Sequence, residues 1–163
     1  MLPGIMRDNP DYYAVQIMND ILGGGGFTSR ITNRVRSDEG LAYSAYSYCP
    51  GGTYFPRTFV AGYQSKSRTV LYAAQIVLEE MLKITQEEVT DKEIETAKAS
   101  YIQTFPQAFE TKGAIASTFA SEEFTGRLSN NPNYFDNFRS KIRAVTKADV
   151  QRVAGKYLTP DKV

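Results

Sequence analysis

Apolar residues recur with a helical period in two long stretches of the chain. Asn9-Pro10 is typical of a helix N-cap followed by proline in the first turn. The apolar positions that follow lie on one helix face: Tyr13, Ala14, Ile17, Met18, Ile21 and Leu22. Over residues 67–84 a second stripe is expected to face the core, with Glu79, Glu80 and Lys83 facing away: Val70, Leu71, Ala74, Val77, Leu78, Met81 and Leu82. The pattern predicts two amphipathic helices.

A β-hairpin is predicted between these helices. Residues 41–48 (LAYSAYSY) and 53–63 (TYFPRTFVAGY) are rich in aromatic and β-branched residues, and Pro50-Gly51-Gly52 separates them. Pro56 suits an edge strand or a bulge because it has no backbone N–H to donate. A two-stranded sheet alone is marginal in water. We therefore expect further strands from outside this segment or from a partner chain, with one beginning near the ending LTPDKV.

Shorter helices complete the pattern. One is expected over 27–39, ended by Gly40, and another begins with the capping-box sequence Thr90-Asp91-Lys92-Glu93 and is kinked or ended by Pro106. Three more are expected over 110–127, after Asn131-Pro132, and from Thr146 to about Tyr157. The sequence thus predicts an α+β fold, with a mainly antiparallel sheet packed against several helices.

Composition excludes several classes of function. Among 163 residues, 19 Lys and Arg nearly balance 18 Asp and Glu, so there is no footprint for nucleic acid. Histidine is absent and there is one cysteine, which excludes a Ser-His-Asp or Cys-His arrangement and the usual zinc ligand sets within this chain. No apolar run approaches the roughly 20 residues of a membrane span. No signal peptide is recognised, and the localisation stays unknown.

The glycine run Gly23, Gly24, Gly25 and Gly26 is the first candidate site. It lacks the lysine of a phosphate-binding loop, and a helix precedes it where a dinucleotide fingerprint needs a strand. A hinge between helices fits better. Four consecutive glycines nevertheless carry a high cost in backbone entropy, so we expect a flexible loop that moves or admits another backbone.

The basic and acidic residues have ordinary explanations. Arginines followed by tyrosines are compatible with single-stranded nucleic acid, but Arg30 and Arg34 have the i, i+4 spacing of a solvated helix face. Arg36 is favourable near a helix C-terminus without any ligand. Adjacent glutamates point apart on a helix, and Cys49 has no basic neighbour. We therefore predict no catalytic residue in this chain.

Residues 9–47 carry a specific resemblance. A helix ending in LGG, then SR and a hydrophobic residue, then R-x-x-x-G-L-A-Y-S, resembles the second, non-catalytic domain of the pitrilysin/insulinase-type zinc peptidases, the group that includes the mitochondrial processing peptidases. Weaker similarity continues through 67–84, TDKEIETAK and VTKADVQRVAGKYLTPDKV. The resemblance implies that residues 1–163 are a single inactive domain, a segment of a longer chain.

The resemblance also implies a role. In that family two related domains face each other; one carries an H-x-x-E-H zinc motif, and the other contributes an Arg and a Tyr seven positions apart. Arg36 and Tyr43 have that separation and would bind peptide substrate. Zinc would belong to the homologous partner domain or subunit, with no cofactor in this chain. The alternative is a structural or interaction module of the same fold with no peptidase role, as in the core subunits of respiratory complexes.

Overall fold

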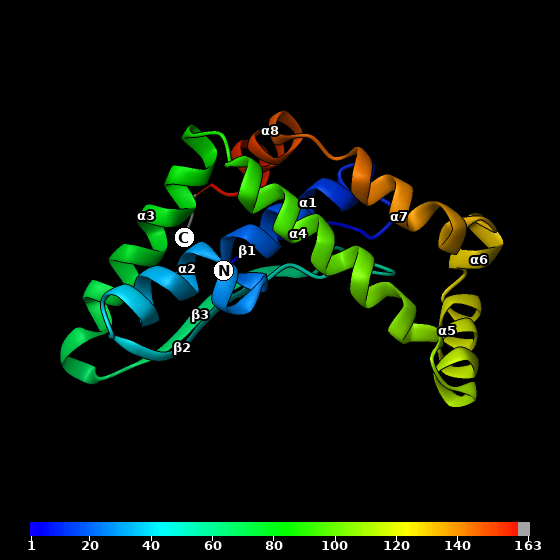
Figure 1. The fold of residues 1–163 in the computed structure, drawn as a ribbon, viewed down its shortest axis with the longest axis horizontal. Coiled ribbons are helices and arrows are strands. Elements are labelled where there is room, and N and C mark those ends of the chain that lie inside the picture. The colour runs from blue at the N-terminus through cyan, green and yellow to red at the C-terminus, as the bar shows by residue number, and fades with distance from the viewer. Residues whose placement is uncertain (160–163) are drawn as a thin grey trace. The chain divides into compact units, whose positions relative to one another are not determined.

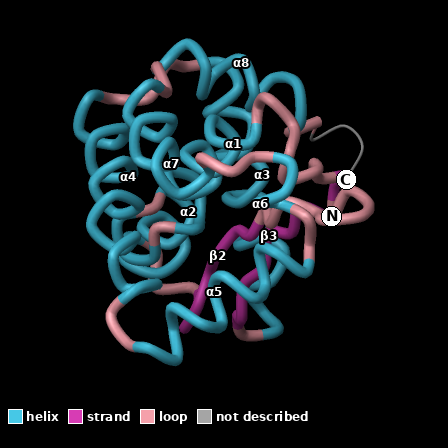
Figure 2. The backbone as a smooth tube through the Cα atoms, turned by 90° about the vertical axis from the view of Figure 1, so that its right-hand side faces the viewer, coloured by secondary structure: helices cyan, strands magenta, loops and turns pink. Residues whose placement is uncertain are grey.

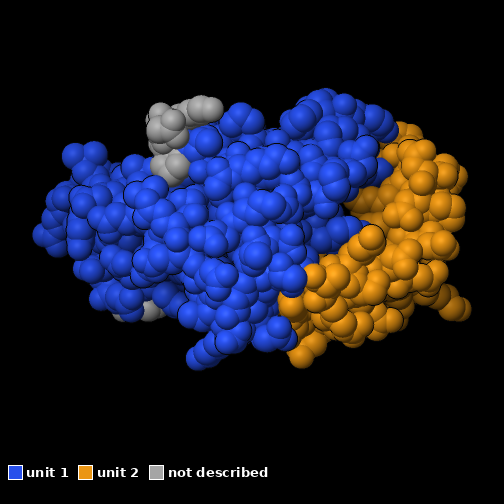
Figure 3. Space-filling model, turned by 90° about the horizontal axis from the view of Figure 1, so that it is seen from above, with its two compact units in different colours: residues 1–97, 145–163 blue, residues 98–144 orange. Residues whose placement is uncertain are grey.

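The structure, a computed structural model, describes residues 1–159 except the side chain of Ser37. Its contacts group the chain into two compact units: one comprises residues 1–97 and the segment from 145, and the other residues 98–144 (Figure 3). The longer elements are α1 (Tyr12–Asn19), β2 (Ala42–Tyr48), β3 (Thr58–Ser65), α3 (Val70–Gln86), α4 (Asp91–Thr104), α5 (Lys112–Phe124), α7 (Tyr134–Ala144) and α8 (Lys147–Tyr157). The shortest are β1 (Leu2–Pro3), α2 (Arg30–Thr32) and α6 (Arg127–Asn130). None of the described helices is both long and apolar enough to cross a bilayer.

The first unit contains a small antiparallel sheet with the strand order β1-β3-β2 (Figure 1). The predicted hairpin is confirmed, with Tyr46 opposite Gly62 in its register. Its second strand begins at Thr58 and not at residue 53, after the point where Pro56 would interrupt the ladder. The third strand, β1, pairs Leu2 with Phe59, so a further strand comes from this chain itself and not from outside the segment as expected. The predicted α+β class, with an antiparallel sheet and several helices, is confirmed.

Helices pack around this sheet in the first unit. α1 lies against α8, and α3 contacts α8, α2 and β3 (Figure 2). Fully buried aliphatic side chains from these helices and from the turn after α1 form the core: Val15, Ile17, Met18, Leu22, Ile76, Ile84, Val150 and Val153.

Two of the sequence signals for helix ends are present in the structure. The Thr146 capping box is confirmed, and Gly40 adopts φ +60° at the end of its helical segment.

A buried carboxylate joins α1 to α8. Asp11 is 7% exposed and accepts hydrogen bonds from Arg152 Nη1 at 2.8 Å, Lys156 Nζ at 2.7 Å and Tyr157 Oη at 2.8 Å. The hydrogen bond from Lys156 is the main reason that the pKa of Asp11 falls to about 2. Asp11 precedes α1, which begins at Tyr12 and not directly after Asn9, because Asn9 Oδ1 accepts a hydrogen bond from the Asp11 N–H in a preceding turn.

The second unit is helical and contains a cluster of half-buried aromatic rings. Phe105 stacks on Phe138 with ring centroids 4.8 Å apart, and Phe109 meets Phe135 edge-on at 5.2 Å. Such pairs add roughly 0.5–1.5 kcal/mol each beyond their buried area.

The segment after the glycine run differs from the single helix expected over 27–39. A 3-10 turn (Gly26–Thr28) is followed by an extended Ser29 with ψ 151°, then by α2 and a π-helical turn (Asn33–Asp38). The extended residue breaks the regular helix into separate pieces. The expected strand near the ending LTPDKV falls largely on residues 160–163, which lie outside the described residues.

The expected core face of α3 is wrong. Of the predicted stripe only Val77 and Met81 are buried, together with Ala73, Ile76, Glu80 and Ile84, whereas Leu71 is 83% exposed. The buried face includes the charged side chain of Glu80. Arg34 Nη1 lies 3.0 Å from Glu80 Oε1, and this ion pair compensates the buried carboxylate. Since α3 has apolar residues on both faces, helical period alone does not identify the buried one.

This reassignment predicts opposite outcomes for two similar substitutions in α3. Ile76→Ala should lower the free energy of unfolding by about 2–5 kcal/mol, because it leaves a cavity at a fully buried site. Leu71→Ala should change it by less than about 0.5 kcal/mol, because the side chain already lies in solvent. Urea denaturation of both variants is the measurement, and a larger loss at Leu71 would restore the original face.

Candidate functional site

Three separate segments bring their side chains together at Arg36. The Arg36 Cζ lies 4.6 Å from the ring centroid of Phe27 and 5.5 Å from that of Tyr43. Phe27 belongs to the 3-10 turn after the glycine run, Arg36 to the π-helical turn and Tyr43 to β2. Gly40, at φ +60°, reverses the chain between Arg36 and Tyr43. The structure thus brings the two predicted binding residues together, with an aromatic residue that was not predicted.

The N–H donors of the Arg36 guanidinium have no hydrogen-bond acceptor among the described residues. Within the described part of the chain, its recorded side-chain contacts are these two rings, and it forms no ion pair. Tyr43 is 80% exposed and Phe27 66% exposed. A guanidinium stays charged at any working pH and presents its N–H donors in a fixed plane. This surface is suited to an oxygen acceptor such as a peptide carbonyl.

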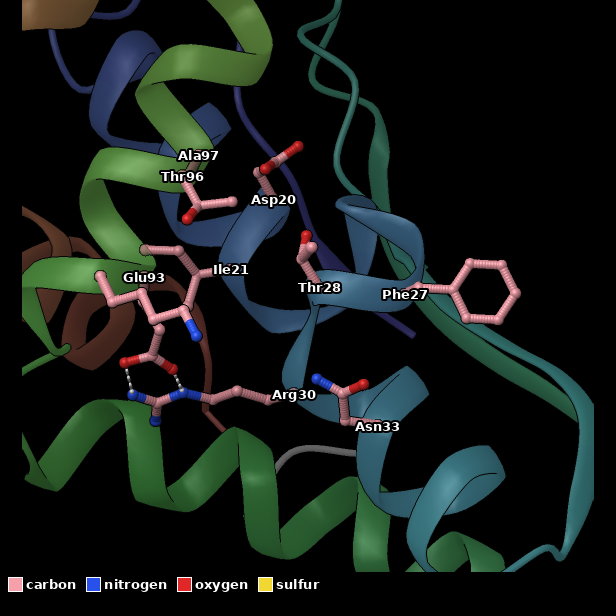
Figure 4. A pocket seen from close by; sticks show the side chains of 10 residues that line it. Asp20, Ile21, Phe27, Thr28, Arg30, Asn33, Glu93, Thr96 and Ala97 are labelled. Carbon is pink, nitrogen blue, oxygen red and sulfur yellow. Dashed lines mark hydrogen bonds and ion pairs between the residues drawn. The ribbon is translucent and has the colours of Figure 1, made fainter.

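Arg30 is not on a solvated face as expected, since its side chain is 12% exposed, whereas the side chain of Arg34 is 37% exposed. Arg30 binds both oxygens of Glu93, with Nε–Oε1 at 2.5 Å and Nη2–Oε2 at 3.0 Å (Figure 4). Burial alone would raise the pKa of Glu93, but hydrogen bonds from Arg30 and from Thr90 lower it to about 2. Arg34 pairs with Glu80. Of the three arginines, Arg36 is therefore the one whose charge is not used in an ion pair within the described structure.

Part of the glycine run belongs to regular secondary structure and not to a loop. Gly23 and Gly24 end the π-helical turn that continues α1 (Asp20–Gly24), and Gly26 has φ +58°. A Cβ on Gly23 would overlap the backbone nitrogen of Ser47 in β2. The first two glycines thus differ from the expected loop after a helix; the mobility of the run stays a prediction.

A cavity of about 360 Å³ opens beside this run (Figure 4). Its walls come from the end of α1, the glycine run, α2 and the first turns of α4: Asp20, Ile21, Phe27, Thr28, Arg30, Asn33, Lys92, Glu93, Thr96 and Ala97. Burial raises the pKa of Asp20 to about 6. No ion pair or side-chain hydrogen bond of Asp20 is recorded in the described structure.

The described residues do not offer a ligand set that fits a catalytic zinc ion. The described residues contain no group of three or more His, Cys, Asp or Glu placed to hold a metal, and the sequence has no histidine. Cys49 is 4% exposed, and burial raises the pKa of its thiol to about 11. A buried thiol in this state is a poor nucleophile at neutral pH.

Comparison with known families shows which family the chain belongs to. Residues 1–101 match the model of the peptidase M16 inactive domain. The chain belongs to this family. The match confirms the resemblance carried by residues 9–47, whereas the narrower likeness to mitochondrial processing peptidases stays a prediction.

Individual relatives of this M16 inactive-domain chain are longer than it. An uncharacterized zinc protease of Streptomyces coelicolor is 29% identical over 94% of this chain and 32% of its own length. The crystal structure of a peptidase M16 inactive domain from Pseudomonas fluorescens is 27% identical, with a TM-score of 0.85, over 98% of this chain and 37% of that one. A protease from Helicobacter pylori, 18% identical, shares the fold with a TM-score of 0.80, over 98% of this chain and 37% of that one. The chain thus spans about a third of the length of these relatives.

The half-buried Asp20 predicts a stability effect that depends on pH. Because its pKa is about 6 in the folded chain and 3.8 is the ordinary value, the folded state keeps a proton that the unfolded state releases between pH 4 and 6. Stability from this proton is present at low pH and is lost as pH rises through 6. Asp20→Asn should therefore raise the free energy of unfolding by about 1–2 kcal/mol at pH 7.5, and by much less at pH 4.

Urea titrations at the two pH values measure this effect, with Glu110→Gln as an exposed control that should be neutral at both. An equal gain at pH 4 and pH 7.5 would show that Asp20 ionisation is not responsible.

The close packing of Gly23 predicts a second effect. Gly23→Ala should destabilise the chain by about 1–3 kcal/mol, because the added methyl group displaces the backbone of β2 at Ser47. Gly155→Ala is the matched control: it lies within α8 with open space around it, so alanine should stabilise the helix by about 0.5–1 kcal/mol. The melting temperatures of both variants are the measurement. If Gly23→Ala leaves the melting temperature unchanged, close packing does not explain why position 23 is glycine.

Proposed function

We propose that this chain is the substrate-binding, non-catalytic half of a zinc metallopeptidase. Arg36 and Tyr43 hold the backbone of a peptide that a zinc-bearing homologous domain or subunit hydrolyses. The observation that carries the proposal is the arrangement of Arg36 between two exposed aromatic rings, with its hydrogen-bond donors uncommitted in the described structure.

Each residue has a chemical task in this proposal. The Arg36 guanidinium donates to a carbonyl oxygen of the peptide, and such charge-assisted hydrogen bonds are roughly twice as strong as neutral ones. The Tyr43 hydroxyl either donates to a second carbonyl or accepts from an amide N–H. Phe27 and Tyr43 hold the plane of the guanidinium, so less rotational freedom is lost when peptide binds.

The hydrolytic chemistry lies outside this chain. Zinc peptidases use a metal-activated water, and the part of the chain that the structure describes contains no group of side chains placed to hold that metal. The Streptomyces relative is named a zinc protease and is about three times as long as the segment it shares with this chain, which supports a zinc-bearing domain elsewhere in the protein or in a partner. We accordingly propose that residues 1–163 form one inactive domain of a longer chain.

The test is a substitution series at Arg36 and Tyr43 in the protein assembled with its zinc-bearing half. Arg36→Ala should lower kcat/KM about ten- to hundredfold, the equivalent of the roughly 1.5–3 kcal/mol of a charge-assisted hydrogen bond. Arg36→Lys should recover only part of this loss, since an ammonium does not reproduce the planar fork. Tyr43→Phe should lose less than Tyr43→Ala, because the ring remains beside Arg36.

The melting temperature is measured for the same variants. Arg36→Ala should leave it nearly unchanged, because contacts of a partly exposed guanidinium with aromatic rings contribute only about 0.5–1 kcal/mol. Arg68→Ala, at an exposed arginine outside the site, is the control and should alter neither quantity. If Arg36→Ala retains the wild-type activity per folded molecule, the proposal is wrong and the structural or interaction module without a peptidase role remains.

A further inference from the structure

We propose that the outward face of α3 binds an amphipathic α-helix from another part of the same polypeptide. The bound helix carries apolar residues at alternating intervals of three and four, as the helices of a coiled coil do. This inference rests on one element of the proposed function, that residues 1–163 belong to a longer chain, and it is independent of the peptide site at Arg36.

The face of α3 that points away from the core is apolar. Leu71 is 83% exposed, Leu82 46% and Leu78 39%. The opposite side of the same helix is fully buried at Ile76 and Ile84. Single exposed leucines are ordinary on protein surfaces, but three along one face of a 17-residue helix form a contiguous patch. Lysine, glutamate or glutamine would form the helix as readily, so helix formation does not require these leucines.

The side chains on this outward face enclose a groove of about 490 Å³. Within the described structure α3 supplies its lining residues: Leu71, Ala74, Gln75, Leu78, Glu79 and Leu82. They form two overlapping sets of positions i, i+3, i+4 and i+7, the first beginning at Leu71 and the second at Gln75. Four neighbouring residues of this kind form the hole that accepts one side chain of a facing helix in knobs-into-holes packing. The groove therefore has the geometry to accept two successive side chains of a docked helix.

The two borders of the groove differ in chemistry. One border continues into an apolar hollow of about 160 Å³, which shares Ala74 and Leu78 with the groove. The other residues of this hollow come from the first residues of the chain, from β3 and from α3: Met1, Leu2, Phe59, Ala61, Tyr63, Val77 and Met81. The opposite border is polar, because Gln75 Nε2 donates to Glu79 Oε1 at 2.9 Å and Arg34 Nη2 lies 3.8 Å from Glu79 Oε2. The docked helix thus places apolar side chains toward β3 and polar side chains toward Glu79.

The small size of the groove favours a tethered helix over a separate molecule. Six residues line it, whereas a standard interface between separate proteins involves roughly 20–30 residues on each side. A second copy of the chain, or an unrelated protein, gains too little contact here to stay bound. A helix of the same polypeptide is held nearby at an effective concentration of roughly millimolar, so a small contact is sufficient. This chain covers 32% of the Streptomyces relative, so most of that protein lies outside the matched segment.

Thiol labelling of the full-length protein tests whether the groove is covered. Leu71→Cys places a thiol in the groove, and Lys83→Cys places one on an exposed flank of the same helix, outside the lining. Both native side chains are exposed in residues 1–163, so neither change disturbs the core, and labelling of the wild type is subtracted. We expect maleimide to modify Leu71→Cys about tenfold more slowly than Lys83→Cys, because the docked helix must open first. Equal rates would overturn the proposal.

Photo-crosslinking identifies what lies in the groove. Leu71 is replaced by p-benzoylphenylalanine in the full-length protein, and the crosslinked peptides are identified by mass spectrometry. We expect a crosslink within one polypeptide, from position 71 to a helix outside residues 1–163 whose apolar residues have the three-and-four spacing. A crosslinked dimer, a crosslink to another protein, a crosslink confined to residues 1–163, or none at all would each contradict it.

A charge placed in the groove connects the crosslink to its geometry. Leu82→Glu, combined with the photoprobe at position 71, should lower the crosslinked fraction about tenfold, because docking would remove the added carboxylate from water. Lys83→Gln, on the flank, should leave the fraction unchanged. A crosslinked fraction that Leu82→Glu does not lower would show that the groove does not hold the helix.

These experiments separate the docking surface from the peptide site. Activity that falls in Arg36→Ala, together with fast labelling of Leu71→Cys, refutes the docking and leaves the proposed function standing. A crosslink from position 71 to the same polypeptide, in a protein whose activity ignores Arg36, supports the docking and refutes the substrate-binding role.

Discussion

The close approach of Gly23 to Ser47 is the contact on which the rest of the site depends. Without a Cβ at Gly23, the end of α1 lies directly against the backbone of β2. The Ser47 hydroxyl then donates to Asn19 Oδ1 at 2.9 Å, so the polar groups buried at this junction are satisfied. This contact fixes the glycine run, which leads to Phe27, relative to the strand that carries Tyr43. Arg36 lies between two rings because both supports are held in place.

Ion pairs and hydrogen bonds secure the irregular segment that contains Arg36. Thr32 Oγ1 donates to the Ala45 carbonyl at 2.8 Å, Arg30 is bound to Glu93 of α4, and Arg34 is bound to Glu80 of α3. The broken helix is thus tied to β2, α4 and α3. The backbone hydrogen bonds of short 3-10, α and π turns do not by themselves stabilise a single conformation of such a segment. Its irregular backbone is stabilised by tertiary contacts.

Local signals in the sequence predicted much of this fold. The hairpin, the capping boxes and the glycine at the end of the Arg36 segment each depend on a few neighbouring residues, and each is present. The face of α3 was not predictable, because apolar residues lie on both faces of the helix and the buried one includes Glu80, whose charge is paired with Arg34 46 positions away. β1 has two residues, too few for an alternating pattern. Phe27 was missed because nothing in FTSR indicates which way its ring points.

Within the candidate site, Arg36 and Tyr43 are placed together as their spacing suggested, whereas the cavity beside them was not foreseen. Its walls come from two segments, residues 20–33 and 92–97, that lie far apart in the sequence, and the environment of Asp20 depends on how those segments enclose it. A sequence shows that a carboxylate is present, but its degree of burial and its distance from any cation are properties of the folded chain.

The contact of Arg36 with aromatic rings has a consequence for its response to ionic strength. Its attraction to Phe27 and Tyr43 is between a charge and the quadrupoles of rings whose centroids lie at 4.6 and 5.5 Å, within the roughly 8 Å over which dissolved ions screen at physiological salt. The contact therefore persists at physiological ionic strength. In concentrated salt the screening length falls to about 3 Å, shorter than both distances, so the orientation of the guanidinium then depends on packing against the two rings.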